Sequence, residues 1–249
     1  MRRRSLTGRA DRSGFLRLAA ALSVNVDELK RKAGIAAAAE VHDGMVVGLG
    51  TGSTVRFTIE ELGRRVKEDG LRIKGIPTSL ASEELARKVG IHLTTLDADP
   101  VVDLTIDGAD ELDPKLRLIK GGGGALTREK VVAKASKRMV VVADAGKSVP
   151  TLGTTFALPI EVLEFAKTPV QRAVAALGAT VTLRVKEGKT VRTDNGNVIL
   201  DAKFDSIRDP EALERTLELM PGVVTCGLFL GLCQAAYIAG RDGVTKMGV

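Results

Sequence analysis

The feature that most constrains the fold is an alternation of strand-like and helix-like segments that begins near Asp27. Short apolar runs, typical of buried strands, alternate with longer amphipathic segments, typical of helices. The predicted helices cover 27–41, 53–67, 79–89 and 127–137, and the predicted strands cover 45–50, 71–77, 101–106, 116–120 and 139–143. This order predicts an α/β fold with a doubly wound, Rossmann-like, mostly parallel sheet, and ligands are expected at the carboxyl ends of its strands.

The order of elements changes after about residue 153. The predicted elements are strand 155–162, helix 164–177, strands 180–185 and 197–204, helix 210–219 and strand 223–230. This β-α-β-β-α-β order predicts a smaller ferredoxin-like α+β domain over 153–230. The apolar run 235–239 is expected to return to the first sheet, so the Rossmann-like domain is predicted to comprise 27–152 and 231–249.

The positive charge lies at the amino terminus. The formal net charge is +6, and residues 1–26 contain six arginines and one acidic residue, which leaves the rest of the chain nearly neutral. We expect 1–26 to be a basic extension that is disordered or dispensable, with organellar targeting or contact with a polyanion as alternatives. A nearly neutral body with six Phe, one Tyr and no Trp is not typical of a nucleic-acid-binding protein.

Residues 221–240 carry no charge over about the length of a bilayer span. Glycines divide this stretch into two short apolar runs, which favour buried strands, so no membrane contact is expected. Cys226 and Cys233 match no zinc-binding spacing and are predicted to be free core thiols in a reducing, cytoplasmic compartment. His42 and His92 are predicted to be structural, and no metal site is expected.

A glycine- and hydroxyl-rich turn, GLGTGST at 48–54, joins an apolar strand to an amphipathic helix. Its backbone N–H groups and the helix dipole can bind an anion, so a phosphate site is predicted. Ser53 stands where a dinucleotide-binding turn has its third glycine and where a nucleoside-triphosphate loop has lysine, which argues against both. A tight strand-to-helix turn without a ligand remains the alternative.

Three acids, Asp107, Asp110 and Glu111, follow the predicted strand 101–106. They are expected in a loop at the functional edge of the sheet, with a Mg²⁺ site or simple solvated acids as alternatives. Lys120 then precedes four glycines, a costly sequence unless something approaches the backbone closely.

Thr127 is predicted to cap the next helix, which would place Glu129 in its first turn. The helix dipole favours an ionised carboxylate there. A purely capping role for Glu129 remains the alternative. Together, the phosphate turn, the acids, Lys120 and Glu129 are expected at successive carboxyl edges of one sheet.

The chain resembles the ribose-5-phosphate isomerase type A family from about Asp27 to its last residue. The resemblance is carried in order by VGLGTGST (47–54), GIPTS (75–79), DGADE (107–111), KGGGGALTREK (120–130), ADAGK (143–147), LPIEV (158–162), DNGNVILD (194–201) and PGVVTCGLF (221–229). The chain departs from the family pattern at Cys233-Gln234, where the family usually has Ala-Asp.

The resemblance implies a metal- and cofactor-independent interconversion of D-ribose 5-phosphate and D-ribulose 5-phosphate in the non-oxidative pentose phosphate pathway. In that chemistry Glu129 moves a proton between C2 and C1 through an enediolate. Lys120 would stabilise the enediolate oxygen, Asp107 would assist ring opening and proton movement between O1 and O2, and Asp110 would hold sugar hydroxyls.

The resemblance also implies a substrate-binding set: Thr51, Gly52, Ser53, Thr54, Asp107, Gly108, Ala109, Asp110, Lys120, Gly121, Gly122, Gly123 and Lys147. Within this set 51–54 and Lys147 would grip the phosphate, and Lys30 is a weaker candidate. The implied partners are a small sugar phosphate and further copies of the chain, as a homodimer or homotetramer.

Other functions remain open at this stage. A non-enzymatic sugar-phosphate sensor of the same fold would be expected to carry a DNA-binding helix-turn-helix, for which 26 residues are too few. A coenzyme A transferase or a sugar-phosphate deaminase could share the fold, but the deaminase should supply a catalytic histidine, and neither histidine lies in a motif.

Overall fold

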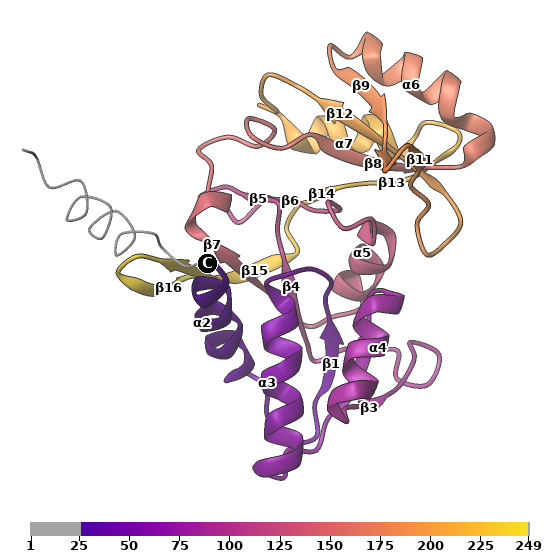
Figure 1. Cartoon of the computed structure of the whole chain (residues 1–249). Coiled ribbons are helices and arrows are strands. Elements are labelled where there is room, and N and C mark those ends of the chain that lie inside the picture. Colours follow the sequence, from indigo (N-terminus) through magenta and orange to yellow (C-terminus); the bar gives the residue numbers. More distant parts are fainter. Residues whose placement is uncertain (1–25, 249) are drawn as a thin grey trace, which may run out of the picture.

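The computed structural model describes residues 26–248, and the elements carry the numbers used in Figure 1. The predicted basic extension lies outside the described residues except for Val26. The central sheet has seven strands in the order β16-β15-β7-β4-β1-β2-β3. Their bounds are β1 (Val46–Leu49), β2 (Lys74–Pro77), β3 (His92–Leu93), β4 (Leu104–Gly108), β7 (Met139–Asp144), β15 (Cys233–Gly240) and β16 (Gly243–Gly248).

Every neighbouring pair in this sheet is parallel except β15 and β16. The α/β, doubly wound prediction is therefore confirmed. The helices are α2 (Val26–Ala38), α3 (Val55–Glu68), α4 (Leu80–Val89) and α5 (Leu126–Lys134). Helices α2, α3 and α4 pack on one face of the sheet, and α5 packs on the other.

Strand periodicity decides which side chains meet which helices. In β4, Leu104 and Ile106 join the core under α2 and α3, so Asp107 points to the opposite face, where α5 lies. In β7, Val140 and Val142 face the first core, whereas Val141 and Ala143 face the second. The alternation thus sends an acidic side chain toward α5 from the end of a central strand.

A second sheet lies at the top of Figure 1 and has the antiparallel order β13-β8-β12-β9. Its elements are β8 (Leu158–Val162), α6 (Lys167–Ala176), β9 (Thr180–Leu183), β12 (Val198–Lys203), α7 (Pro210–Glu218) and β13 (Val223–Cys226). This is the predicted β-α-β-β-α-β order. Short elements complete this part: η2 (Glu164–Ala166), β10 (Val185–Lys186) and β11 (Lys189–Thr190).

A small antiparallel sheet, β14-β6-β5, connects the two parts. It consists of β5 (Glu111–Leu112), β6 (Leu118–Ile119) and β14 (Leu228–Phe229). The prediction of one strand over 223–230 was wrong, because Gly227 divides it into β13 and β14, which belong to different sheets. The Gly227 carbonyl accepts from Lys120 N at 2.8 Å, and a Cβ on Gly227 would lie 2.2 Å from the Lys120 carbonyl oxygen. Only glycine allows this crossing.

The run 235–239 does return to the first sheet, as part of β15 beside β7. Strand β16 was not predicted. At the departure from the family pattern, Gln234 Oε1 accepts from Met139 N at 2.7 Å, and the β15–β7 register shifts there. Cys226 and Cys233 are buried free thiols, as predicted. Within residues 26–248, none of the helices has the length and apolar character needed to cross a bilayer.

Candidate active site

A crevice of about 120 Å³ lies at the carboxyl ends of β1 and β4, where the strand order of the central sheet reverses. Most of the predicted site residues line it. The lining residues are Lys30, Gly52, Ser53, Thr54, Gly108, Ala109, Asp110, Lys120, Gly121, Gly122, Gly123, Glu129 and Lys147. This volume suits a small metabolite and is too small for a dinucleotide.

The turn after β1 forms one wall of the crevice. Gly52 has a φ of +125°, and Lys30 Nζ donates to Ser53 Oγ at 3.0 Å. Helix α3 begins just after this turn with no acidic residue in its first turn, so its amino end keeps its attraction for an anion. Lys147 also lines the crevice and ends the short helix η1 (Ala145–Lys147) after β7.

Thr51 and Asp107 do not line the crevice and lie beneath it. The Thr51 hydroxyl is 2.7 Å from Ser79 Oγ and 2.8 Å from Thr78 Oγ1, so it faces α4. The Thr51 amide donates to Asp107 Oδ1 at 3.0 Å. A Cβ on Gly50 would lie 2.3 Å from the same oxygen, so a glycine is required where the turn passes over Asp107.

Asp107 and Lys120 form a fully buried ion pair. Asp107 Oδ1 also accepts from Gly108 N at 2.7 Å, and its Oδ2 is 2.9 Å from Lys120 Nζ. Lys120 Nζ donates to the Gly108 carbonyl at 2.6 Å. Burial raises the pKa of Asp107, and Lys120 opposes this shift. Burial would lower the pKa of Lys120, but the negative charges of Asp107 and Glu129 outweigh it and raise that pKa.

Glu129 is the second acid beside Lys120. It lies in the first turn of α5, as predicted, and its Oε2 is 3.4 Å from Lys120 Nζ. This oxygen is buried and accepts no hydrogen bond from any described residue. Burial raises the pKa of Glu129 to about 8, the charge of Asp107 adds to the shift, and Lys120 opposes it. One lysine cannot neutralise two carboxylates, so Glu129 can gain or lose a proton near neutral pH.

The predicted capping role of Thr127 is wrong. Helix α5 begins at Leu126, after Ala125, and has no side-chain cap. Leu126 is fully buried, and this packing places Thr127 inside the first turn. The Thr127 hydroxyl instead donates to Glu161 Oε2 of β8 at 2.5 Å.

The three acids expected in one loop separate into different environments. Asp107 and Glu111 are strand residues and are fully buried, so the alternative of solvated loop acids is wrong for both. Asp110 lines the crevice, and its Oδ2 accepts from Gly122 N at 2.7 Å. Glu111 points away and accepts from the amides of Gly153 and Thr155, both at 2.6 Å. Glu111 therefore anchors the chain before β8.

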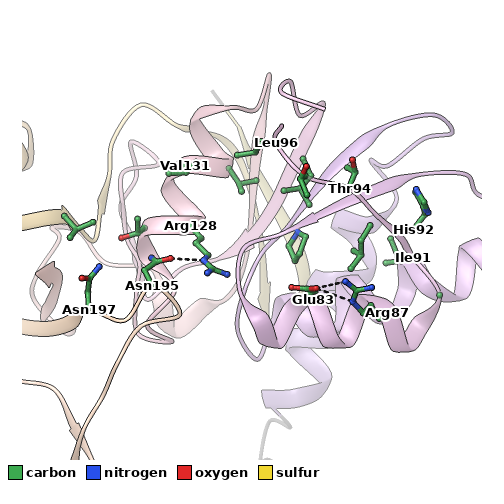
Figure 2. A pocket seen from close by; sticks show the side chains of 18 residues that line it. Glu83, Arg87, Ile91, His92, Thr94, Leu96, Arg128, Val131, Asn195 and Asn197 are labelled. Atoms are coloured by element: carbon green, nitrogen blue, oxygen red, sulfur yellow. Dashed lines mark hydrogen bonds and ion pairs between the residues drawn. The ribbon is translucent and has the colours of Figure 1, made fainter. Parts of the chain in front are cut away.

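A larger groove of about 1080 Å³ lies between α4, β3 and α5, and none of the predicted site residues lines it (Figure 2). His92 is exposed on its rim. Arg128 points into the groove, and its Nε donates to Asn195 Oδ1 at 3.0 Å. Neither His42 nor His92 lines the crevice, so the crevice lacks the histidine expected of a deaminase.

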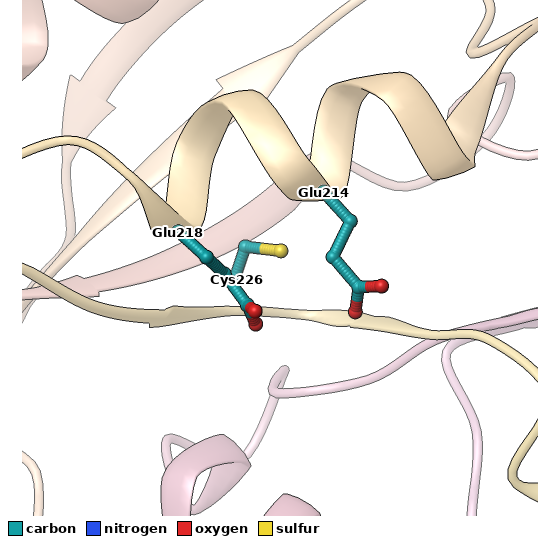
Figure 3. Close-up of side chains that lie close together, drawn as sticks. All are labelled: Glu214, Glu218 and Cys226. Atoms are coloured by element: carbon teal, nitrogen blue, oxygen red, sulfur yellow. The ribbon is translucent and has the colours of Figure 1, made fainter.

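Across residues 26–248, one group of potential metal ligands is present, formed by Glu214 and Glu218 of α7 and Cys226 of β13 (Figure 3). Lys130 Nζ lies 3.0 Å from a carboxylate oxygen of each glutamate. Burial raises the pKa of Cys226 to about 11, so the thiol is protonated. The group is therefore an ion-pair network that joins α5 to α7.

The fold and the crevice together define an α/β enzyme that acts on a small anionic metabolite by proton transfer. The chain belongs to the ribose 5-phosphate isomerase A (phosphoriboisomerase A) family, whose model matches residues 74–243. It is 53% identical to ribose-5-phosphate isomerase A of Methanosarcina acetivorans over 220 aligned residues. The alignment covers 88% of this chain and 93% of the relative. The corresponding enzyme of Bradyrhizobium diazoefficiens is 49% identical, over 89% and 95% of the two chains.

Solved structures of ribose 5-phosphate isomerases are also similar to this chain. The structure of a ribose 5-phosphate isomerase A from Methanocaldococcus jannaschii matches this one with a TM-score of 0.86 and 41% sequence identity. The match covers 90% of this chain and 99% of that chain. A D-ribose-5-phosphate isomerase in complex with phospho-erythronic acid has a TM-score of 0.89 and 38% identity, over 91% and 100% of the two chains.

Proposed function

We propose that this protein interconverts D-ribose 5-phosphate and D-ribulose 5-phosphate through an enediolate. The observation that carries the proposal is the buried Glu129 carboxylate, whose Oε2 accepts no hydrogen bond within the described residues and lies 3.4 Å from Lys120 Nζ in a crevice of metabolite size. Family membership supports the same reaction and favours an enzyme over a non-enzymatic sugar-phosphate sensor.

The phosphate of the substrate would bind at 52–54, where the amino end of α3 and the side chains of Lys30 and Lys147 face the crevice. Backbone N–H groups and cations are the groups that bind phosphate most readily in proteins. Asp110 and the backbone of 121–123 line the rest of the crevice and would hold the sugar hydroxyls. Binding at both ends would orient C1 and C2 against Glu129.

In the forward direction, ionised Glu129 would take the proton from C2 of the open-chain aldose. The electrons of the C2–H bond would form the C1=C2 double bond of the enediolate, and the π electrons of the C1 carbonyl would move onto O1. Glu129 would then deliver the proton to C1, which accepts it with the electrons of the C1=C2 double bond, while the C2 hydroxyl loses its proton to O1 and becomes the carbonyl of the ketose. A positioned general base contributes about 10²- to 10⁴-fold to such a step. Lys120 would stabilise the enediolate oxygen with a charge already in place.

Asp107 does not line the crevice, so its implied role in ring opening and O1–O2 proton movement would operate through its contact with Lys120. We propose that the site consists of the residues that the sequence predicted. Thr51 would contribute through its amide, which donates to Asp107.

We further propose that residues 27–152 with 231–249 form the catalytic domain and that 153–230 form the second domain. We also propose that the protein acts in the cytoplasm as a homodimer or homotetramer, without a nucleic-acid partner.

The decisive experiment is an assay of the purified protein with ribose 5-phosphate and a panel of other phosphorylated aldoses in the presence of EDTA. We expect ribulose 5-phosphate to form at an unchanged rate when the chelator is added. Saturable binding of ribose 5-phosphate without turnover would support the sensor instead, and turnover abolished by EDTA would contradict the metal-independent mechanism.

A further inference from the structure

A second buried acid lies on the other side of the first turn of α5. Glu161 of β8 is fully buried, and among residues 26–248 the side chains that donate to its carboxylate are neutral. Its Oε2 accepts from Thr127 at 2.5 Å, and its Oε1 accepts from Thr193 at 2.8 Å, Asn197 at 2.9 Å and Asn195 at 3.2 Å. None of these residues lines the crevice.

The turn at 193–197 makes a further connection to the same helical turn. Arg128 donates to Asn195 Oδ1 at 3.0 Å, as Figure 2 shows, and to the Asp194 carbonyl at 3.2 Å. The Asp194 carboxylate accepts from Leu80 N, at the start of α4, at 2.8 Å. The two residues that immediately precede Glu129 are therefore both held by the ferredoxin-like part of the chain.

Apart from its ion pair with Lys120 at 3.4 Å, Glu129 has no comparable support of its own. Helix α5 has no side-chain cap at Ala125, and Glu129 Oε2 accepts no hydrogen bond from the described residues. The placement of a side chain with so few partners depends strongly on its backbone. The backbone of this turn is held through Thr127, whose hydroxyl bonds to a carboxylate that is itself fixed by three other donors.

We infer that Glu161 is a positioning residue for Glu129: by holding Thr127, it fixes the first turn of α5 and thereby the placement of the Glu129 carboxylate beside Lys120. Four donors converge on Glu161, and a carboxylate can accept from all of them, whereas an amide with its N–H₂ group in the place of Oε2 would make the Thr127 hydroxyl an acceptor. The inference rests on the proposed function, because it assigns Glu161 to the isomerase reaction.

The test uses two substitutions in the full-length protein, Thr127→Val and Glu161→Gln. Misplacing a reacting group by about 1 Å can cost about 100-fold in rate, so we expect kcat for ribose 5-phosphate to fall about 10- to 100-fold. KM should change less than about 3-fold, because the residues proposed to bind the phosphate, 52–54 and Lys147, are not substituted. Thr127→Ser retains the hydroxyl and should restore kcat to within about 2-fold of the wild-type value.

Asp113→Asn is the matched control for loss of a buried carboxylate. Asp113 is 2% exposed and accepts from Lys115 N and Arg117 N, both at 2.9 Å, within its own loop. We expect this variant to lower the Tm and leave kcat unchanged. If Glu161→Gln does not fold, Thr127→Val and Thr127→Ser carry the comparison.

Wild-type kcat in Thr127→Val would overturn the positioning role, even if its Tm falls. An equal loss of kcat in Asp113→Asn would also overturn it, since any destabilisation would then suffice. A wild-type protein that converts no sugar phosphate would overturn the proposed function itself, so the wild-type assay separates the two failures.

Discussion

Two buried glutamates lie at the first turn of α5, Glu129 within it and Glu161 in contact with it through Thr127, and they differ in what surrounds them. Glu161 accepts hydrogen bonds from four neutral side chains. Glu129 shares one lysine with Asp107, keeps an oxygen without a hydrogen bond in the described structure, and has a pKa raised to about 8 by burial. A carboxylate that accepts hydrogen bonds at both oxygens stabilises and orients the chain, whereas one with an oxygen that accepts none is available to take a proton.

The sharpest way to break this comparison is Glu129→Gln. The amide keeps the size of the side chain and cannot act as a base, so we expect kcat to fall by about 10²- to 10⁴-fold. The affinity for ribose 5-phosphate should remain close to wild type, because the phosphate grip is intact. Steady-state kinetics and calorimetry measure the two quantities, and unchanged turnover would remove Glu129 from the mechanism.

The next largest effect is expected for Lys120→Met. Removing a preorganised donor to a developing oxyanion typically costs about 10²- to 10³-fold in kcat. The variant should also lose stability, because Asp107 and Glu129 would be buried without a cation. Lys130→Met is the matched control, since Lys130 is also buried and also joins two acids. A loss of kcat in the control as large as that in Lys120→Met would contradict the proposed role of Lys120.

A further effect is expected on the pH profile of the wild-type protein. Glu129 must be ionised to take a proton, so kcat/KM should rise about tenfold per pH unit below its pKa and level off above about pH 8. In Thr127→Val, kcat/KM should be lower at every pH, but its pH dependence should be unchanged, because the same group still takes the proton. A profile that is flat between pH 5 and about 8 would show that Glu129 is not the titrating base.

The same pKa predicts a pH dependence of stability. Because the folded-state pKa of Glu129 lies above its ordinary value of 4.5, the protonated group stabilises the fold fully below about pH 4.5. This contribution is lost as the pH rises toward 8. Chemical denaturation at several pH values should show this decline in wild type and a smaller one in Glu129→Gln.

Much of this site follows from the sequence. Parallel strands end at a common edge, so the residues after β1, β4 and β7 had to meet there, and the crevice does contain 52–54, Asp110 and Lys147. Glu129 was also predicted in the first turn of α5 and lies there, although the prediction rested on a Thr127 cap that the structure does not contain.

Other parts depend on contacts between residues distant in sequence. Glu111 was grouped with Asp107 and Asp110, but Glu111 belongs to β5 of the small sheet, whereas Asp107 belongs to β4, and Glu111 faces the segment before β8. Thr127 has the residue type of a helix cap, yet the packing of Leu126 and an acceptor on β8 decide its position. Two-residue strands such as β5 and β14 are held by their neighbours and have no periodicity to detect.

The place of β15 in the central sheet has a consequence for synthesis of the protein. This strand lies between β7 and β16, although it follows the whole ferredoxin-like part in the chain. A ribosome therefore releases residues 26–232 before the partner of β7 exists, and Val140–Ala143 then form an open strand edge. We expect nascent chains stalled before residue 233 to engage chaperones and to misassociate more readily than completed ones.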